Sequence, residues 1–257
     1  MKIETISEMD RGLAYAEACF ETFRVINGEI FGWPAHAARL QHGLAAFALA
    51  VSDAQLEQMH TACLQAVTGS DAVVRLTISG GEAPWGLFTA ATSVAARIQV
   101  LAYHAQSAPL ALTVLEWPSP PADRIAKFTA DYAATLRILR GERHALLVHE
   151  QQLLSAAAAN VMICRRGEWS TPPAGAGVLP GVIRHSLLAA GIVREQPCPV
   201  AWLDDCDALA LTASSFFVRP VSTISHMQHA RALHDRSHVL KQCLAGLPGV
   251  PKDLLDA

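Results

Sequence analysis

The sequence predicts a two-domain protein of the α+β or α/β class. The stretch FETFRVINGEIF, residues 20–31, places strand-forming residues on both sides of Asn27-Gly28, a dipeptide that favours hairpin turns. Apolar residues then recur at helical spacing over residues 34–51, so strand and helix signals share the first half of the chain. The stretch EWPSPPADR, residues 116–124, holds three prolines, which preclude a continuous helix or a central strand. It therefore predicts a linker between two domains.

The first domain is expected to span residues 1–116. Pro34 suits the first turn of the helix that follows the hairpin, because a proline there sacrifices no hydrogen bond. A second helix is predicted over residues 53–67. The remaining elements are three predicted strands: AVVRLTISGG (72–81), ARIQVLAYH (96–104) and LALTVLEW (110–117).

The second domain is expected to span residues 125–257, after a linker at residues 117–124. Residues 145–169 read as strand, turn and strand, with Gly167 in a tight turn. A loop rich in Gly and Pro then leads into a helix that is predicted to stop at Gly191.

Two predictions concern the end of the chain. Residues 207–224, DALALTASSFFVRPVSTI, are expected to form one strand with a polar centre. The region from His226 to His238 holds four histidines at irregular spacing, without a carboxylate or cysteine pattern. This favours a solvated helix over a metal site.

Composition limits the classes of function. Of the 257 residues, 51% are hydrophobic and 17% charged, which is typical of a globular chain. A net charge of -3 provides no basic face for nucleic acid or for an acidic membrane, so a small molecule is the expected partner. The acidic N-terminal stretch lacks an apolar run and is not expected to act as a signal peptide, and no stretch of about 18 apolar residues that would predict a membrane span is found. Six cysteines without a CxxC pattern indicate free thiols in a cytoplasmic protein and no metal site.

Lys127 is the only lysine between residues 3 and 240. A primary amine can lose its proton and attack a carbonyl carbon, whereas a guanidinium stays charged. The alternative is that Lys127 simply lies on a solvated face of an arginine-rich chain. The surrounding sequence must decide between a reactive amine and a surface charge.

Five motifs favour the reactive amine: DRGLAYAEACFETFRV, HAARL, AKFTADYAATL, GVLPGVIR and LTASSFFVRPV. Their order and spacing, from about residue 10 to residue 224, resemble the class IV aminotransferase family of fold-type IV pyridoxal-phosphate enzymes. The first motif is most similar to the 4-amino-4-deoxychorismate lyase branch. The resemblance implies a two-domain fold like that of D-amino-acid aminotransferase, with pyridoxal 5'-phosphate as the cofactor.

The resemblance implies that Lys127 forms the Schiff base with the cofactor. This chemistry needs a neutral amine, so desolvation and nearby cations are expected to favour the uncharged form. Tyr132 matches the family tyrosine that bonds the cofactor's phenolic oxygen, and Asp131 stands where asparagine is usual.

The resemblance also implies a set of groups that hold the cofactor phosphate. Arg39 matches an arginine whose planar fork can bind two oxygens. The amides of Val182 and Ile183 lie at a predicted helix start, where anions bind readily. Ser214 and Ser215 match positions that face the phosphate in other members.

One departure from the family concerns the cofactor's pyridine nitrogen. The stretch LLSAAAANV puts Ser155 where the family has a glutamate that pairs with this nitrogen. A neutral serine cannot hold a pyridinium, so the cofactor should withdraw electrons less strongly. This favours elimination over transamination, although loss of activity explains the change equally well.

A second departure concerns the substrate carboxylate. In SGGEAPWGLF, Trp85 and Leu87 stand where family members commonly present an arginine followed by a tyrosine or histidine. Together with Phe20 they are the candidates for contact with the substrate. Three arginines are possible replacements for the missing charge, and the sequence selects none of them: Arg11, Arg24 and Arg75.

These observations favour a pyridoxal-phosphate-dependent lyase that releases pyruvate and forms 4-aminobenzoate or a related product, as in folate biosynthesis. A branched-chain or D-amino-acid aminotransferase is the first alternative, favoured by Tyr132 five residues after Lys127. A non-catalytic relative acting as a binding subunit is the second, favoured by loss of the family glutamate and arginine. By resemblance alone, a homodimer is expected.

Overall fold

The computed structural model describes residues 7–89, 91, 93–104, 110–142, 144–226 and 229–255. The chain forms two compact units, which are Met1–Ala102 with Ala126–Ala134, and Tyr103–Ile125 with Thr135–Ala257. This division differs from the expected boundary at residue 116. The reason is that strand β5 (Leu110–Glu116) hydrogen-bonds to strands of the second unit.

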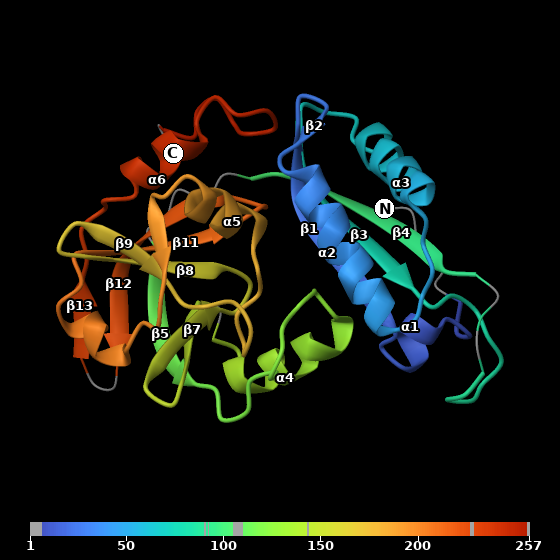
Figure 1. The fold of residues 1–257 in the computed structure, drawn as a ribbon, viewed down its shortest axis with the longest axis horizontal. Coiled ribbons are helices and arrows are strands. Elements are labelled where there is room, and N and C mark those ends of the chain that lie inside the picture. Colours follow the sequence, from blue (N-terminus) through green and yellow to red (C-terminus); the bar gives the residue numbers. More distant parts are fainter. Residues whose placement is uncertain are drawn as a thin grey trace. The chain divides into compact units, whose positions relative to one another are not determined.

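The first unit is a four-stranded antiparallel sheet in the order β2-β1-β3-β4, with helices α2 and α3 packed on it (Figure 1). The predicted hairpin is confirmed, because Asn27 and Gly28 have φ angles of 51° and 80° between paired strands. Its elements are α1 (Arg11–Ala14), β1 (Ala18–Ile26), β2 (Glu29–Ile30), α2 (Trp33–Ala46), α3 (Asp53–Gln65), β3 (Asp71–Ser79) and β4 (Ala95–Ala102).

The pleat of β1 divides its side chains between two faces of this sheet. Glu21 pairs in register with Leu76, which belongs to the core beneath the helices, so the Glu21 carboxylate lies on the helix-covered face. Its neighbour Phe20 pairs with Thr77, and Thr22 pairs with Arg75. The side chains of Phe20 and Arg75 therefore share the opposite face.

A buried ionic network joins α2 to β1. Glu21 is 1% exposed, and its carboxylate accepts hydrogen bonds of 2.6 Å from both Nε and Nη2 of Arg39. The Nδ1 atom of His36 lies 2.7 Å from the same carboxylate. Burial would raise the pKa of Glu21, but the charges of Lys127 and Arg39 and the hydrogen bonds from Arg39 and His36 outweigh it and lower this pKa. The carboxylate is therefore ionised at neutral pH.

The second unit is built on a nine-stranded mixed sheet. Its strand order is β10-β9-β8-β11-β12-β5-β6-β7, and β13 pairs with β12. Helix α4 begins in the first unit and ends in the second. The elements after β5 are α4 (Thr129–Leu139), β6 (Ala145–His149), β7 (Gln152–Ala156), β8 (Asn160–Arg165), β9 (Glu168–Thr171), α5 (Val182–Ala189), β10 (Val193–Glu195), a 3-10 turn (Val200–Asp204), β11 (Ala208–Ala213), β12 (Phe217–His226), β13 (His229–Ala232) and α6 (His238–Leu244).

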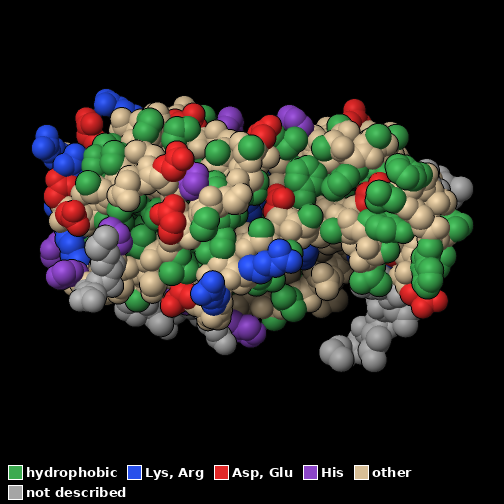
Figure 2. All heavy atoms as spheres, turned by 90° about the horizontal axis from the view of Figure 1, so that it is seen from below, with side chains coloured by type: hydrophobic (Ala, Val, Ile, Leu, Met, Phe, Trp, Pro, Cys, Tyr) green, Lys and Arg blue, Asp and Glu red, His purple; other side chains and the backbone are tan. Residues whose placement is uncertain are grey.

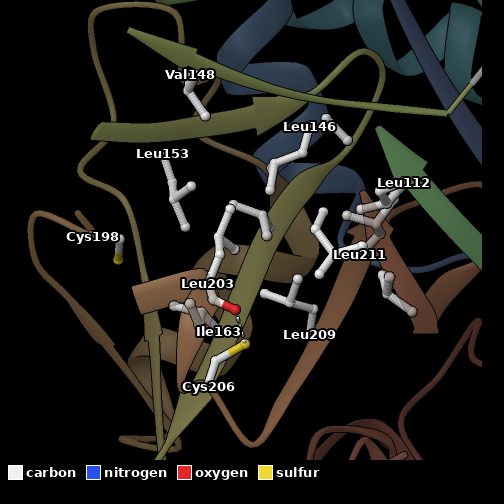
Figure 3. Close-up of a cluster of buried hydrophobic side chains, with 14 of the residues drawn as sticks. Leu112, Leu146, Val148, Leu153, Ile163, Cys198, Leu203, Cys206, Leu209 and Leu211 are labelled. Carbon is white, nitrogen blue, oxygen red and sulfur yellow. Dashed lines mark hydrogen bonds between the residues drawn. The ribbon is translucent and has the colours of Figure 1, made fainter. Parts of the chain in front are cut away.

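The core of the second unit consists of aliphatic side chains from most strands of this sheet. Figure 3 shows Leu146, Leu153 and Ile163 pointing toward Leu209 and Leu211 from neighbouring strands. The core is closed by the segment after β10, which contributes two buried cysteines and a leucine. These three residues are Cys198, Leu203 and Cys206.

Two predictions for the end of the chain are wrong. Residues 207–224 form two antiparallel strands, β11 and β12, because the polar centre of this stretch is a turn rather than the middle of a strand. The segment from His226 to His238 is not a helix. His226 pairs with His229 across a hairpin, and α6 begins only at His238, while residues 227 and 228 lie outside the described residues.

The surface carries mixed charges. On the face drawn in Figure 2, lysine and arginine side chains occur in small groups separated by acidic, hydrophobic and neutral residues. Within the described residues, none of the helices has the length and apolar character that crossing a membrane requires.

The Glu21 network predicts a specific stability defect. We expect Glu21→Gln to lower the free energy of unfolding by about 3–5 kcal/mol, because Arg39 would remain buried without its counter-charge. Chemical denaturation followed by circular dichroism measures this change. Glu57→Gln is the matched control, since Glu57 pairs with His60 on the exposed surface of α3.

The same comparison has a pH dependence. Because the folded-state pKa of Glu21 is lowered, its stabilisation is complete above the ordinary carboxyl pKa of about 4.3 and is lost as the pH falls below that value. The stability difference between wild type and Glu21→Gln should therefore shrink below about pH 4. A difference that is constant down to pH 3 would contradict this account.

Candidate active site

Lys127 is fixed by its main chain to the edge of β1. Its carbonyl accepts a 3.0 Å hydrogen bond from the amide of Phe20, and Cys19 forms a β-bridge with Phe128. The Lys127 side chain is 16% exposed, and its Nζ atom lies 3.8 Å from Oε2 of Glu21. The structure thus brings Lys127 and Arg39 to the same carboxylate.

The surroundings of Lys127 act on its amine in two directions. The Glu21 carboxylate, 3.8 Å from Nζ, stabilises the ammonium form, whereas the low exposure of the side chain and the Arg39 guanidinium on the same carboxylate favour the neutral amine. His36 adds no charge of its own, because burial, opposed by Glu21, lowers its pKa. Its Nε2 atom is buried without a hydrogen-bond partner among the described residues.

Sequence reasoning missed Glu21 and His36. A signal for His36 exists in HAARL, because a histidine and an arginine three residues apart lie on one face of a helix. For Glu21 the signal is weaker: it is an acidic residue at an otherwise apolar position of a predicted strand.

Phe20, Tyr132 and Arg75 form a second cluster, on the face of the sheet opposite α2. The rings of Phe20 and Tyr132 are 5.1 Å apart at 52°, and the Arg75 guanidinium carbon lies 3.6 Å from the centre of the Phe20 ring. The Nζ atom of Lys127 is 5.8 Å from that centre. Burial lowers the pKa of Arg75, and Tyr132 acts in the opposite direction. An arginine nevertheless stays cationic at neutral pH.

The three candidate arginines differ in their partners. Arg11 forms an ion pair with Glu17, and both nitrogens on one edge of Arg24 bond Asp71. Among the described residues, no Asp or Glu side chain lies within 4.0 Å of the Arg75 guanidinium. Within the described part of the chain, Arg75 is therefore the one of these three arginines that has no acidic side chain within 4.0 Å, and it lies over the Phe20 ring.

The loop that replaces the family arginine is organised around Arg11. The Arg11 guanidinium donates to the carbonyls of Gly86, Leu87 and Thr89. The side chains of Trp85 and Leu87 are 77% and 65% exposed. Among the described residues, the hydrogen bonds of this loop join it to the Arg11 guanidinium and the Tyr15 hydroxyl, and none of them reaches Lys127.

In the second unit, Ser155 is a buried residue of β7. Its hydroxyl donates a 3.1 Å hydrogen bond to the carbonyl of Gly177. The hydroxyl proton is thus directed at the backbone, and the serine oxygen keeps its acceptor capacity.

The start of α5 offers donors for an anion. Val182 and Ile183 occupy its first turn, where amides have no partner within the helix, and Gly181 at the N-cap provides no side-chain cap. Asn160 fixes the backbone just before α5, because its side-chain amide donates a 2.8 Å hydrogen bond to the carbonyl of Leu179. A Cβ atom on Gly181 would lie only 2.0 Å from Asn160 Oδ1, so glycine is required there.

Asn160 also links α5 to the end of β11. It pairs in register with Thr212, whose hydroxyl oxygen is buried without a hydrogen-bond partner among the described residues. Ser214 and Ser215 lie in the half-buried turn that follows β11. Sequence reasoning missed Thr212, although it precedes these serines in the same motif.

These residues fit pyridoxal phosphate. In the first unit, Lys127 carries an amine of the kind that an aldehyde binds, and Arg39 presents a guanidinium bonded to the same carboxylate as that amine. In the second unit, the start of α5 and the unpartnered Thr212 hydroxyl are donor groups of the kind that a phosphate binds.

Comparisons with known proteins agree with this chemistry. The family model described as amino-transferase class IV matches residues 18–224. A comparison with curated proteins gives no match.

Three solved structures show the same fold at low sequence identity. A putative 4-amino-4-deoxychorismate lyase of Legionella pneumophila is 20% identical with a TM-score of 0.81, over 95% of this chain and 94% of that one. A branched-chain amino acid aminotransferase of Escherichia coli is 20% identical with a TM-score of 0.80, over 93% and 88%. A hypothetical aminotransferase of Mycobacterium tuberculosis in its pyridoxal-phosphate-bound form is 18% identical with a TM-score of 0.77, over 95% and 93%.

The predicted α+β fold of the fold-type IV enzymes is confirmed by these neighbours. The match of the family model spans most of the chain and includes the segments that carry Arg39, Lys127 and Ser155. The chain therefore belongs to the class IV aminotransferase family, whose enzymes use pyridoxal phosphate.

Proposed function

We propose that the protein is a lyase of the 4-amino-4-deoxychorismate lyase type, which releases pyruvate and leaves 4-aminobenzoate or a related product. The observation that carries this proposal is the buried Ser155, which replaces a carboxylate and bonds the Gly177 carbonyl. We further infer a cytoplasmic homodimer that serves folate biosynthesis.

Lys127 is the proposed acid and base. When bound, pyridoxal phosphate supplies the aldehyde that attaches the amino substrate and a ring that withdraws electrons from it. In this role Lys127 would remove a proton from a substrate carbon and return one, because its amine ends a flexible stem that can reach more than one atom. Glu21 stabilises the protonated form of this amine from 3.8 Å away.

The remaining residues position the cofactor. Arg39, held by Glu21, is the proposed phosphate ligand in the first unit, and Tyr132 is the proposed partner of the phenolic oxygen. In the second unit, the proposed phosphate donors are the amides of Val182 and Ile183 with the hydroxyls of Thr212, Ser214 and Ser215.

Arg75 is the proposed partner of the substrate carboxylate. Its partly buried guanidinium lies over the Phe20 ring, and no acidic side chain of the described residues lies within 4.0 Å of it. A guanidinium in such surroundings binds a carboxylate through two parallel hydrogen bonds. The proposed substrate is therefore an amino acid or amino-substituted acid whose carboxylate lies near Phe20.

An aminotransferase for branched-chain or D-amino acids is the second candidate. Tyr132 favours it, because a tyrosine five residues after Lys127 resembles that of branched-chain enzymes. A non-catalytic binding subunit is the third, since the family's glutamate and loop arginine are both replaced.

The first test concerns Lys127. Wild-type protein with added pyridoxal phosphate is expected to develop a visible absorption band, and borohydride should fix the cofactor covalently on the peptide that contains Lys127. Lys127→Ala should show neither the band nor the adduct by mass spectrometry. Lys252→Ala, at an exposed lysine, is the matched control. A wild type without a band would favour the binding subunit.

The second test concerns Ser155. We expect Ser155→Glu to raise transaminase activity, assayed with a panel of amino acids, relative to lyase activity, because a carboxylate stabilises a protonated pyridine nitrogen. Ser155→Ala controls for loss of the hydroxyl alone. If the transaminase activity of Ser155→Glu did not exceed that of wild type, our explanation of Ser155 would be wrong.

The third test concerns Arg75. Arg75→Gln should raise the KM for the lyase substrate at least tenfold, since charge-assisted hydrogen bonds contribute about 1.5–3 kcal/mol. Arg75→Lys, which keeps the charge but not the fork, should fall between the two. Arg194→Gln, at an exposed arginine paired with Glu168, serves as the control. A KM for Arg75→Gln within twofold of wild type would rule out this role.

A further inference from the structure

His36 is a buried histidine whose part in the site has not been assigned. It is 0% exposed, it lies one turn before Arg39 on α2, and its Nδ1 atom lies 2.7 Å from Oε2 of Glu21. Because this carboxylate is ionised, it can only accept hydrogen bonds, so the imidazole proton belongs on Nδ1. His36 is therefore a donor to the same carboxylate that Arg39 and Lys127 approach.

The oxygen that His36 bonds is the one that lies 3.8 Å from Nζ of Lys127. This oxygen, Oε2 of Glu21, also accepts a 2.6 Å hydrogen bond from Nη2 of Arg39. A carboxylate oxygen has two lone pairs, and these two donors occupy both. The distance from Lys127 exceeds the length of a charge-assisted hydrogen bond, about 2.7–2.9 Å. The amine therefore lies beside an oxygen whose acceptor sites are already taken.

The charges of this cluster balance without a proton on Lys127. Arg39 and Glu21 form a bidentate pair of opposite charges. Burial, opposed by the hydrogen bond and charge of Glu21, lowers the pKa of His36, so the imidazole is neutral at neutral pH. A proton on Lys127 thus adds one positive charge to a buried cluster of zero net charge, and the Arg39 guanidinium repels it.

The elements around Lys127 bring further titratable or charged groups. Burial and the charge of Glu21 raise the pKa of the Cys19 thiol on β1 to about 12, so this thiol is neutral. The guanidinium of Arg75 on β3 stays cationic, and α4 contributes the phenol of Tyr132. Glu21 is the acidic side chain that the structure places within 4.0 Å of the amine. Access to its lone pairs therefore decides how strongly the ammonium form is stabilised.

We propose that His36 is a positioning residue: together with Arg39 it occupies Oε2 of Glu21, so that the Lys127 amine lies near the carboxylate without a direct hydrogen bond to it and gives up its proton more readily. This inference rests on the proposed function, in which that amine takes up and returns protons. The stem of Lys127 is flexible, so without His36 its amine could approach Oε2 to hydrogen-bond distance. The carboxylate would then hold the ammonium form.

The small number of lysines makes this amine measurable on its own, because the chain has four, at positions 2, 127, 241 and 252. The full chain, before pyridoxal phosphate is added, is exposed to pulses of acetic anhydride between pH 6 and 11. Mass spectrometry of the Lys127 peptide then gives the acetylation rate, and its midpoint is the pKa of the amine, because only the neutral amine reacts. The exposed Lys252 is the reference in the same sample, and we expect the wild-type midpoint of Lys127 to lie below it.

His36→Leu removes the donor and fills the space with an apolar side chain. The midpoint of Lys127 should rise by about one to two pH units, the strength of a charge-assisted hydrogen bond. At pH 8 this rise lowers the acetylation rate of Lys127 roughly ten- to hundredfold. His36→Asn, whose side-chain amide keeps a donor near the position of Nδ1, should restore the wild-type midpoint. His42→Leu, at an exposed histidine of the same helix, is the matched control and should leave it unchanged.

Chemical denaturation of the same variants separates positioning from support of the fold. A histidine that only supports the fold would, when replaced, lower the free energy of unfolding and leave the Lys127 midpoint unchanged. If His36→Leu did not fold, His36→Met would take its place, since its flexible side chain adapts to irregular spaces.

The outcomes separate this inference from the proposed function. The same Lys127 midpoint in wild type and His36→Leu would overturn the role of His36, as would a His36→Asn midpoint equal to that of His36→Leu. A wild-type midpoint at or above that of Lys252 would also overturn it. These results need no cofactor. A raised midpoint in His36→Leu, without a borohydride adduct at Lys127 in wild type, would support the role of His36 and overturn the proposed function.

Discussion

The buried carboxylate of Glu21 is the interaction on which the first unit depends. It is a single anion that collects a guanidinium, an imidazole and an amine from two other segments of the chain. The guanidinium and the amine would be unfavourable in the interior without it, since a desolvated charge requires a close partner, and the neutral imidazole gains a hydrogen-bond partner. The position of Arg39 on α2 and that of Lys127 before α4 are therefore set by one side chain of β1.

The alternation of β1 then separates two tasks. Glu21 faces the helices and binds the cations of Arg39 and Lys127. Phe20 faces the other way and contacts Arg75 and Tyr132. Lys127 sits at the edge of the same strand, within reach of both Glu21 and Phe20. One strand of the first unit thus positions a carboxylate on one face, an aromatic ring on the other and the proposed reactive amine at its edge.

Local chemistry explains what could be predicted from the sequence. The hairpin at Asn27-Gly28 and the helices after it follow from turn preference and periodicity, which act over a few residues. The partners of Glu21 could not be predicted, because they depend on contacts between distant segments. The polar centre of residues 207–224 was misread because two serines suit both an exposed strand and a turn, and only pairing between β11 and β12 distinguishes them.

The anchoring of Lys127 has a consequence for motion. Its carbonyl is tied to the amide of Phe20, and the Thr129 hydroxyl donates to the carbonyls of Ala16 and Ala18. The Cα atom is thereby immobilised, while the four methylene groups beyond it keep their rotamers. The amine can therefore change position by a few ångströms through rotation of its side chain while the main chain of Lys127 stays in place. In the role proposed for Lys127, its amine moves through side-chain torsions, which relax in picoseconds to nanoseconds.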